Sequence, residues 1–272
     1  MQQSRTEDRL PSPDASSTPA RRRRCANVSS TTGHPAATDV VGSVGECDGF
    51  FLDQTPPEIP GVLEDKKVKY DRYKLICQKY NNDKKFMTLY DTAKKIPVFS
   101  AYKYTGHTHF DSRVQSPWTL EEGIDDQATE EEYSGARNPD DYQKGHLFPV
   151  SHANTEEDQK STYKLTNSVP QVGSFNVGRW KVLEGNFKKF MDENCIHDTT
   201  KQVEAFVITG AISEGDKKLG TITVPDSLWT AFCCKVGKVT FQKAAWDTNI
   251  ENNGHKIPFQ TLEELNKKLQ IL

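Results

Sequence analysis

The chain has 272 residues, an apolar fraction of 35% and a formal net charge of −3. This length fits one large domain with a tail, and the charge excludes a uniformly basic surface, so any polyanion would have to bind a local basic strip. No run of about 18 or more apolar residues occurs, so we expect no transmembrane helix, and the N-terminus lacks the pattern of a signal peptide.

The N-terminal residues 1–45 predict a disordered tail. They are rich in Ser, Thr, Pro and Arg and hold few large apolar side chains. Arg21 to Arg24 form a basic cluster, which fits either a nuclear address or a solvated tail. Asn27 begins a glycosylation sequon, which would be glycosylated only if the chain enters the secretory route. Residues 46–272 carry enough aromatic and aliphatic side chains to form one domain.

The cysteines contain no Cys-x-x-Cys pair, so a structural zinc site is not expected. Their even number permits disulfides, but the sequence leaves their pairing and the redox compartment open. The six cysteines are Cys25, Cys47, Cys77, Cys195, Cys233 and Cys234.

The first regular elements are expected after the tail. The β-rich runs 86–90 and 96–102 predict a hairpin, with Pro97 near a strand start or at a sheet edge. Residues 106–141 are broken by glycines and prolines and predict mostly loop. Within this loop, seven of the twelve residues from Glu121 to Glu132 are acidic.

An amphipathic helix is expected around residues 176–190. Asn176 lies at its start and Glu184 follows eight residues later, which places them within about 80° of each other on a regular helix. An amide oxygen and a carboxylate could therefore face one cleft and hold Mg²⁺, which takes oxygen ligands and keeps several waters. The apolar face repeats at spacings of three, four and three residues, at Trp180, Leu183, Phe187 and Phe190.

The last third of the chain predicts further strands and a final helix. The apolar run 205–212 predicts a buried strand, and three more strand candidates are 221–224, 231–236 and 239–245. Thr261 and Glu264 form a capping box at the start of a helix with leucines on one face. The pattern predicts an α+β fold with a mainly antiparallel sheet.

Three segments together resemble the DNA/RNA non-specific endonuclease family, which has a ββα-metal active site. The family fingerprint is Asp-Arg-Gly-His, then Thr-Asn-x-x-Pro-Gln, then an Asn and a Glu on the following helix. The upstream segments 47–57, 76–81 and 89–102 look like vertebrate endonuclease domain-containing 1 proteins, so the resemblance covers residues 46–272. The fingerprint matches at Gly145-His146, Thr166-Asn167, Pro170-Gln171, Asn176 and Glu184.

The resemblance implies hydrolysis of DNA and RNA with little sequence specificity and with Mg²⁺ or another divalent cation such as Mn²⁺. His146 would be the general base, since a neutral imidazole with a pKa of about 6.5 is competent near neutral pH. Asn176 would bind the metal directly, and Glu184 would hold metal-bound waters or complete the shell. Asn167 would orient His146 or the phosphate. Nothing in the sequence predicts the oligomeric state.

The sequence departs from the fingerprint at Gln143-Lys144, which replace Asp-Arg. Lys144, expected to bind and stabilise the substrate phosphate, keeps the charge but loses the bidentate fork of arginine. Arg179 is a further candidate for a phosphate contact. The acidic stretch would repel nucleic acid if it lies near the cleft. These features support an alternative, a catalytically weakened nuclease fold that serves as a binding or innate-immune interaction module. A structural secreted glycoprotein domain is a third reading.

Several other side chains have both a functional and a structural interpretation. His107-Thr108-His109 could bind a metal, but no third ligand is evident and a polar loop is the simpler reading. His152 would line the same cleft as His146 or cap a turn. Trp180 and Trp229 could stack on bases, with core packing as the default. The resembled proteins are typically secretory, which predicts an extracellular location although no signal peptide is visible.

Overall fold

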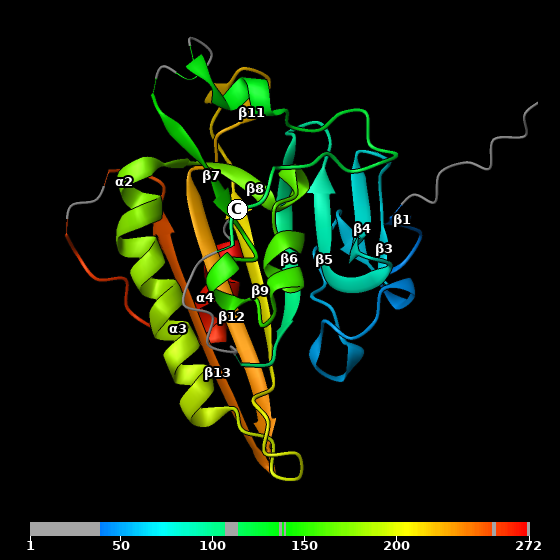
Figure 1. Ribbon diagram of the computed structural model, residues 1–272, viewed down its shortest axis with the longest axis vertical. Coiled ribbons are helices and arrows are strands. Elements are labelled where there is room, and N and C mark those ends of the chain that lie inside the picture. The colour runs from blue at the N-terminus through cyan, green and yellow to red at the C-terminus, as the bar shows by residue number, and fades with distance from the viewer. Residues whose placement is uncertain (1–38, 107–113, 136–137, 139, 252–253, 271–272) are drawn as a thin grey trace, which may run out of the picture. The chain divides into compact units, whose positions relative to one another are not determined.

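The computed structural model describes residues 39–106, 114–135, 138, 140–251 and 254–270 (Figure 1). His107-Thr108-His109 and residues 1–38 of the expected tail lie outside the described residues. The end of that tail is part of the sheet, because strand β1 (Val40–Val41) pairs with β4 through Val40 and Ile76. The folded domain therefore begins before residue 46, where the sequence had placed its start.

The domain combines many strands with few helices. The strands are β1 (Val40–Val41), β2 (Leu63–Glu64), β3 (Lys67–Val68), β4 (Tyr73–Tyr80), β5 (Asp83–Asp91), β6 (Ile96–Tyr104), β7 (Tyr142–His146), β8 (Ser168–Val172), β9 (Ala205–Ile212), β10 (Lys218–Leu219), β11 (Ile222–Thr223), β12 (Ser227–Val236) and β13 (Val239–Thr248). The α-helices are α1 (Glu156–Ser161), α2 (Gly173–Phe175), α3 (Lys181–Asn194) and α4 (Leu262–Gln270). A π-helical turn, Asn176–Trp180, joins α2 to α3.

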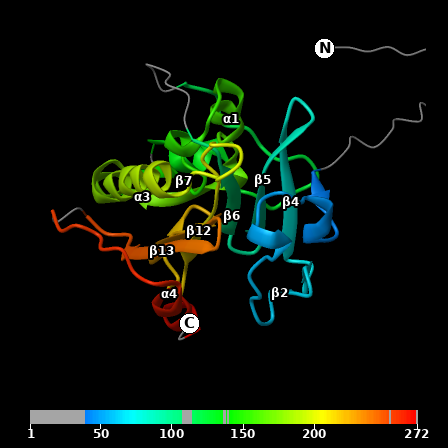
Figure 2. The same cartoon turned by 90° about the horizontal axis from the view of Figure 1, so that it is seen from below.

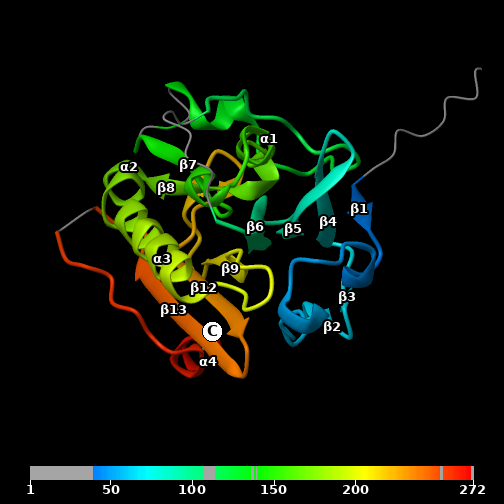
Figure 3. The same cartoon turned by 60° about the horizontal axis from the view of Figure 1, so that its bottom comes forward.

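Seven strands form one antiparallel sheet in the order β1-β4-β5-β6-β9-β12-β13. Strands β7 and β8 form a separate antiparallel hairpin that precedes α2, the π-helical turn and α3. Figure 3 shows this hairpin beside α2 and the start of α3. The expected α+β fold with a mainly antiparallel sheet is confirmed.

The sheet is covered on both faces, since α3 lies on one side and α4 on the other (Figure 2). Alternate residues of a strand point to opposite faces, and β6 follows this rule. Its Tyr102 packs in the core beneath α3, whereas Phe99 and Ala101 pack in the core on the α4 side. The sheet thus provides a rigid support for α3 and for the β7–β8 hairpin.

The structure agrees with most of the expected elements. The hairpin expected at 86–102 is β5–β6, with Pro97 as the second residue of β6, and Thr261 and Glu264 form the expected capping box at α4. The sequence does not predict β7 and β8, because Gly145 and Pro170 are poor strand residues. Among the described helices, none is both long and apolar enough to cross a bilayer.

Two disulfides tie distant segments of the domain together. Cys47 is bonded to Cys77 on β4, and Cys195, directly after α3, is bonded to Cys234 on β12. The second bond holds the C-terminal end of α3 against the sheet. Cys233 carries no disulfide, and burial raises the pKa of its thiol to about 11.

Candidate active site

The β7–β8 hairpin brings two of the three sequence segments side by side. Gln143 pairs with Gln171, and His146 pairs with Ser168. The third segment follows at once through α2, and the side chain of Asn176 donates from Nδ2 to Gln143 Oε1 at 2.8 Å. The fingerprint residues, which are spread over some forty positions of sequence, therefore belong to one continuous motif of hairpin and helix.

Gly145 provides the space that this hairpin needs. The side chain of Gln171 lies directly over it, so that a Cβ atom on residue 145 would be 1.9 Å from Gln171 Oε1 and 2.5 Å from Gln171 Cγ. Gln171 is fully buried, with 0% of its surface exposed. Glycine is required next to His146 for this close approach.

His146 packs against two aromatic side chains, which also contact each other, and is 8% exposed. The centre of its ring is 4.6 Å from that of Trp118 and 5.0 Å from that of Tyr163, and the Tyr163 ring stands nearly perpendicular to it at 89°. These two rings restrict the rotation of the imidazole. The sequence offers no signal for Trp118, which lies in a stretch predicted as loop.

Asn167 is fully buried and holds the backbone that follows His146. Its Oδ1 accepts hydrogen bonds from Ser100 Oγ at 2.8 Å and from the backbone N–H of Phe148 at 3.0 Å. Its Nδ2 donates to the carbonyl oxygens of Phe148 and Thr162. These four bonds make Asn167 a residue that positions the His146 segment, and its amide is directed into the protein rather than toward a phosphate.

Lys144 contacts the acidic stretch that the sequence could not place. Its Nζ forms an ion pair with Glu130 at 2.7 Å and lies 5.5 Å from the centre of the Trp118 ring. The same stretch is anchored in the protein at Glu121, which burial holds at a raised pKa of about 7 beside Lys164. Glu130 therefore places an acidic side chain beside Lys144.

Glu184 lies on α3, two turns after Asn176, and both side chains are partly buried. The backbone carbonyl of Glu184 accepts a hydrogen bond from His152 Nε2 at 2.9 Å. The intervening π-helical turn interrupts the regular helix on which the expected angle between Asn176 and Glu184 was based. Such turns occur frequently at functional sites.

The residues present fit a hydrated divalent cation. Asn176 and Glu184 offer an amide oxygen and carboxylate oxygens, the hard ligands that Mg²⁺ and Mn²⁺ take in proteins. Hydrogen bonding of Asn176 Nδ2 to Gln143 leaves the amide oxygen as the ligand atom. Within the described ranges, no group of three or more His, Cys, Asp or Glu side chains is arranged for a metal, so a cation held here would keep most of its waters.

Arg179 has a structural position and is not suited to the phosphate contact expected from the sequence. It is 4% exposed and forms an ion pair with Asp247. Its other nitrogens donate to the carbonyl oxygens of Thr248, Ile250 and Glu251. Because these bonds tie the π-helical turn before α3 to the end of β13 and the residues after it, we assign Arg179 to fold stability.

The two tryptophans proposed as base-stacking candidates are also part of the cores. Trp180 is 1% exposed beneath α3, and Trp229 is 8% exposed on the opposite face of the sheet.

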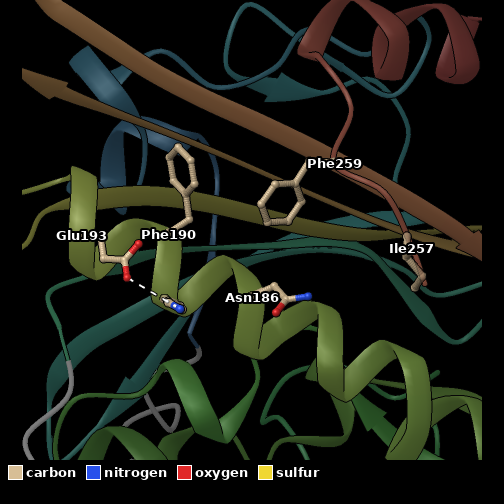
Figure 4. A pocket seen from close by; sticks show the side chains of 6 residues that line it. Asn186, Phe190, Glu193, Ile257 and Phe259 are labelled. Carbon is tan, nitrogen blue, oxygen red and sulfur yellow. Dashed lines mark ion pairs between the residues drawn. The ribbon is translucent and has the colours of Figure 1, made fainter.

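A separate pocket lies along α3, with Asn186, Phe190 and Glu193 on one side and Ile257 and Phe259 on the other (Figure 4). It contains none of the fingerprint residues.

The chain is similar to known nucleases over most of its length. It is 32% identical over 210 residues to the endonuclease domain-containing 1 protein of Mus musculus and 31% identical over 212 residues to that of Homo sapiens, covering 71% of this chain in both cases. The chain spans only 39% of the length of these relatives. A nuclease of Serratia marcescens is 23% identical over 192 residues, with 67% of this chain and 70% of that protein covered.

The fold also matches that of EndoG in the crystal structure of the EndoG/EndoGI complex. The TM-score is 0.57 at 17% identity, with 70% of this chain and 83% of that chain covered. The model of the DNA/RNA non-specific endonuclease family matches residues 65–270, which include both strands of the hairpin and the helix after it. The chain therefore belongs to the DNA/RNA non-specific endonuclease family.

Proposed function

We propose that this domain is a metal-dependent endonuclease that hydrolyses phosphodiester bonds of DNA and RNA with little sequence specificity. The observation that carries the proposal is the motif of hairpin and helix, in which His146 and Gln143 lie on the same strand and Gln143 accepts a hydrogen bond from Asn176. Membership of the nuclease family supports the same reaction class.

His146 acts as the general base in this proposal and takes a proton from the water that attacks phosphorus. The rings of Trp118 and Tyr163 keep the imidazole in one orientation, and Asn167 holds the backbone beyond it. A base that is fixed before the substrate arrives loses no free energy to reorganisation during the reaction. Asn167 is therefore a positioning residue.

Asn176 and Glu184 would hold the cation, with Asn176 as direct ligand and Glu184 bound through waters or directly. A divalent cation in this place would stabilise the charge on the phosphate and on the leaving 3′ oxygen. Gln143 orients the Asn176 amide by accepting its Nδ2 hydrogen. An acceptor at position 143 serves this purpose whether it belongs to an amide or to a carboxylate.

Purified protein should digest both plasmid DNA and RNA in the presence of Mg²⁺ or Mn²⁺, and EDTA should abolish the digestion. The measurement is the release of acid-soluble nucleotides, with circular dichroism to establish that the protein is folded. Folded protein that cleaves neither substrate over a series of divalent cations would contradict the proposal.

A second candidate function is a weakened nuclease fold that binds partners without efficient cleavage. The observations that favour it are Gln143-Lys144 in place of Asp-Arg and the pairing of Lys144 with Glu130. Replacing both residues (Gln143→Asp with Lys144→Arg) distinguishes the two. We expect a gain in kcat/KM below about tenfold, since Gln143 already orients Asn176 and one better hydrogen bond adds about 1 kcal/mol. A gain of several hundredfold would indicate a degenerate active site.

Glu130 should weaken substrate binding because its carboxylate pairs with the cation that is proposed to bind phosphate. We expect Glu130→Gln to lower KM for duplex DNA by about threefold to tenfold with little change in kcat, a difference of about 1 kcal/mol that is typical of such pairs. The matched control is Glu131→Gln, which removes the same charge one residue away on an exposed side chain. Equal KM values for the two variants would show that the effect on substrate binding comes from the net charge and not from the ion pair with Lys144.

We infer that the protein folds in an oxidising compartment, as in secretion. Two disulfides support this, because such bonds persist outside the reducing cytosol. Mass spectrometry of the native N-terminus and of the cysteine state tests the inference, and reduced Cys195 and Cys234 in the native protein would contradict it.

A further inference from the structure

His152 joins the segment after His146 to the helix that carries Glu184. It is 3% exposed and ends the short 3₁₀ helix Val150–His152. Its Nε2 lies 2.9 Å from the backbone carbonyl oxygen of Glu184, and its Nδ1 lies 2.8 Å from Tyr102 Oη. The three residues line one small internal pocket. His152 is not part of the fingerprint that identifies the family.

The chemistry of the partners determines the direction of both hydrogen bonds. A carbonyl oxygen can only accept, so Nε2 of His152 carries the hydrogen donated to Glu184. In the neutral ring Nδ1 is then an acceptor, and the Tyr102 hydroxyl donates to it. Tyr102 is itself immobile, since it is fully buried on β6 and stacks on Phe148 with ring centres 4.0 Å apart. The central sheet is thus connected through His152 to one turn of α3.

This connection matters because the helix is irregular just before Glu184. Gly178 has φ −97° and ψ −114°, which is outside the helical region, and it lies in the π-helical turn between Asn176 and Glu184. The helix backbone alone therefore does not define the orientation of Glu184 relative to Asn176. A hydrogen bond from outside the helix to the Glu184 carbonyl supplies the missing restraint.

We propose that His152 is a positioning residue of the metal site, which holds the Glu184 turn of α3 in the place where its carboxylate can serve the cation. The inference rests on the proposed function of Asn176 and Glu184. Partners that orient a metal ligand without touching the metal typically contribute about 10-fold to 100-fold in metal affinity. A histidine that only fills the core would contribute to stability and leave metal affinity unchanged.

Two substitutions of His152 separate these roles. In His152→Gln, the amide nitrogen lies as far along the side chain as Nε2, so it can still donate to Glu184. In His152→Asn, the amide nitrogen corresponds to Nδ1 and falls short of that carbonyl. We expect His152→Asn to weaken Mn²⁺ binding by about tenfold or more and His152→Gln to stay within about threefold of the unsubstituted protein. Binding is measured from the electron paramagnetic resonance signal of free Mn²⁺, which is independent of cleavage.

Thermal unfolding without metal accompanies each titration and shows which variants are folded at the temperature used. If His152→Asn does not fold, Tyr102→Phe replaces it, because this change removes only the hydroxyl that orients the His152 ring. Unchanged Mn²⁺ affinity in a folded His152→Asn or Tyr102→Phe variant would overturn the inference while leaving the proposed function intact. Failure of the unsubstituted protein to bind Mn²⁺ would overturn both.

Discussion

Replacement of His146 by alanine is expected to lower kcat/KM for cleavage of duplex DNA by between about 10²-fold and 10⁴-fold, the range contributed by a positioned general base. The loss follows from the removal of the only group in the proposed mechanism that accepts the proton of the attacking water. Initial rates over a range of DNA concentrations, at saturating Mg²⁺, provide the measurement. His255→Ala is the control, since it removes an exposed histidine whose ion pair is with Asp247.

The environment of His146 allows a sharper version of this experiment. Alanine leaves a space with the shape of an imidazole ring beside Trp118 and Tyr163. Added imidazole should therefore restore part of the activity of His146→Ala in a saturable manner, while it should leave the unsubstituted protein unchanged. A folded His146→Ala variant with more than about a tenth of the original activity would be incompatible with the general-base role.

Gly145→Ala should have the second large effect, on stability and activity together. The added Cβ would lie 1.9 Å from Gln171 Oε1 and 2.5 Å from Cγ, so the whole buried side chain of Gln171 would have to move. Overpacking of this kind costs about 1–3 kcal/mol, and the displaced hairpin carries His146 with it. We expect a free energy of unfolding in urea lower by that amount and a rate of DNA cleavage lower by at least about tenfold.

The cause of this effect can be tested with a double-mutant cycle. Gln171→Ala removes the atoms that the new Cβ would meet, so Gly145→Ala should cost much less stability in that background. Gly185→Ala is a matched control, because a Cβ on Gly185 meets no described atom within 4 Å and the residue lies within α3. If Gly145→Ala is as harmless as Gly185→Ala, the close approach of Gln171 is not a constraint on the hairpin.

The sequence was sufficient for the elements with strong periodicity and for the family. The β5–β6 hairpin, β9, β11, β12, β13 and α4 all have apolar patterns or caps that specify them locally. Strands β7 and β8 lack such a pattern, since Gly145 on β7 and Pro170 on β8 are poor strand residues. Their pairing depends on the packing of Gln171 over Gly145, a contact between residues far apart in sequence.

The candidate site was predicted in part. Motif spacing named His146, Asn167, Asn176 and Glu184 as candidates, whose roles stay predictions, but it did not predict what each side chain contacts. Arg179 was expected at a phosphate and is instead bonded to Asp247 and to three carbonyl groups. An arginine at the start of an amphipathic helix has the same sequence signature in either role, because the partners on β13 and beyond lie some seventy residues away.

The sequence alone determined the α+β class and named the fingerprint residues as candidates for the site. Both depend on local periodicity and on the order of short motifs, which are properties of residues close together in the chain. The tertiary structure alone decided how the site is enclosed. Trp118 and Tyr163 on the His146 ring, Glu130 on Lys144 and His152 on Glu184 all come from segments without a distinctive pattern. Such contacts arise only when the folded domain brings these segments together. They determine how the candidate side chains are oriented and which charges lie beside them.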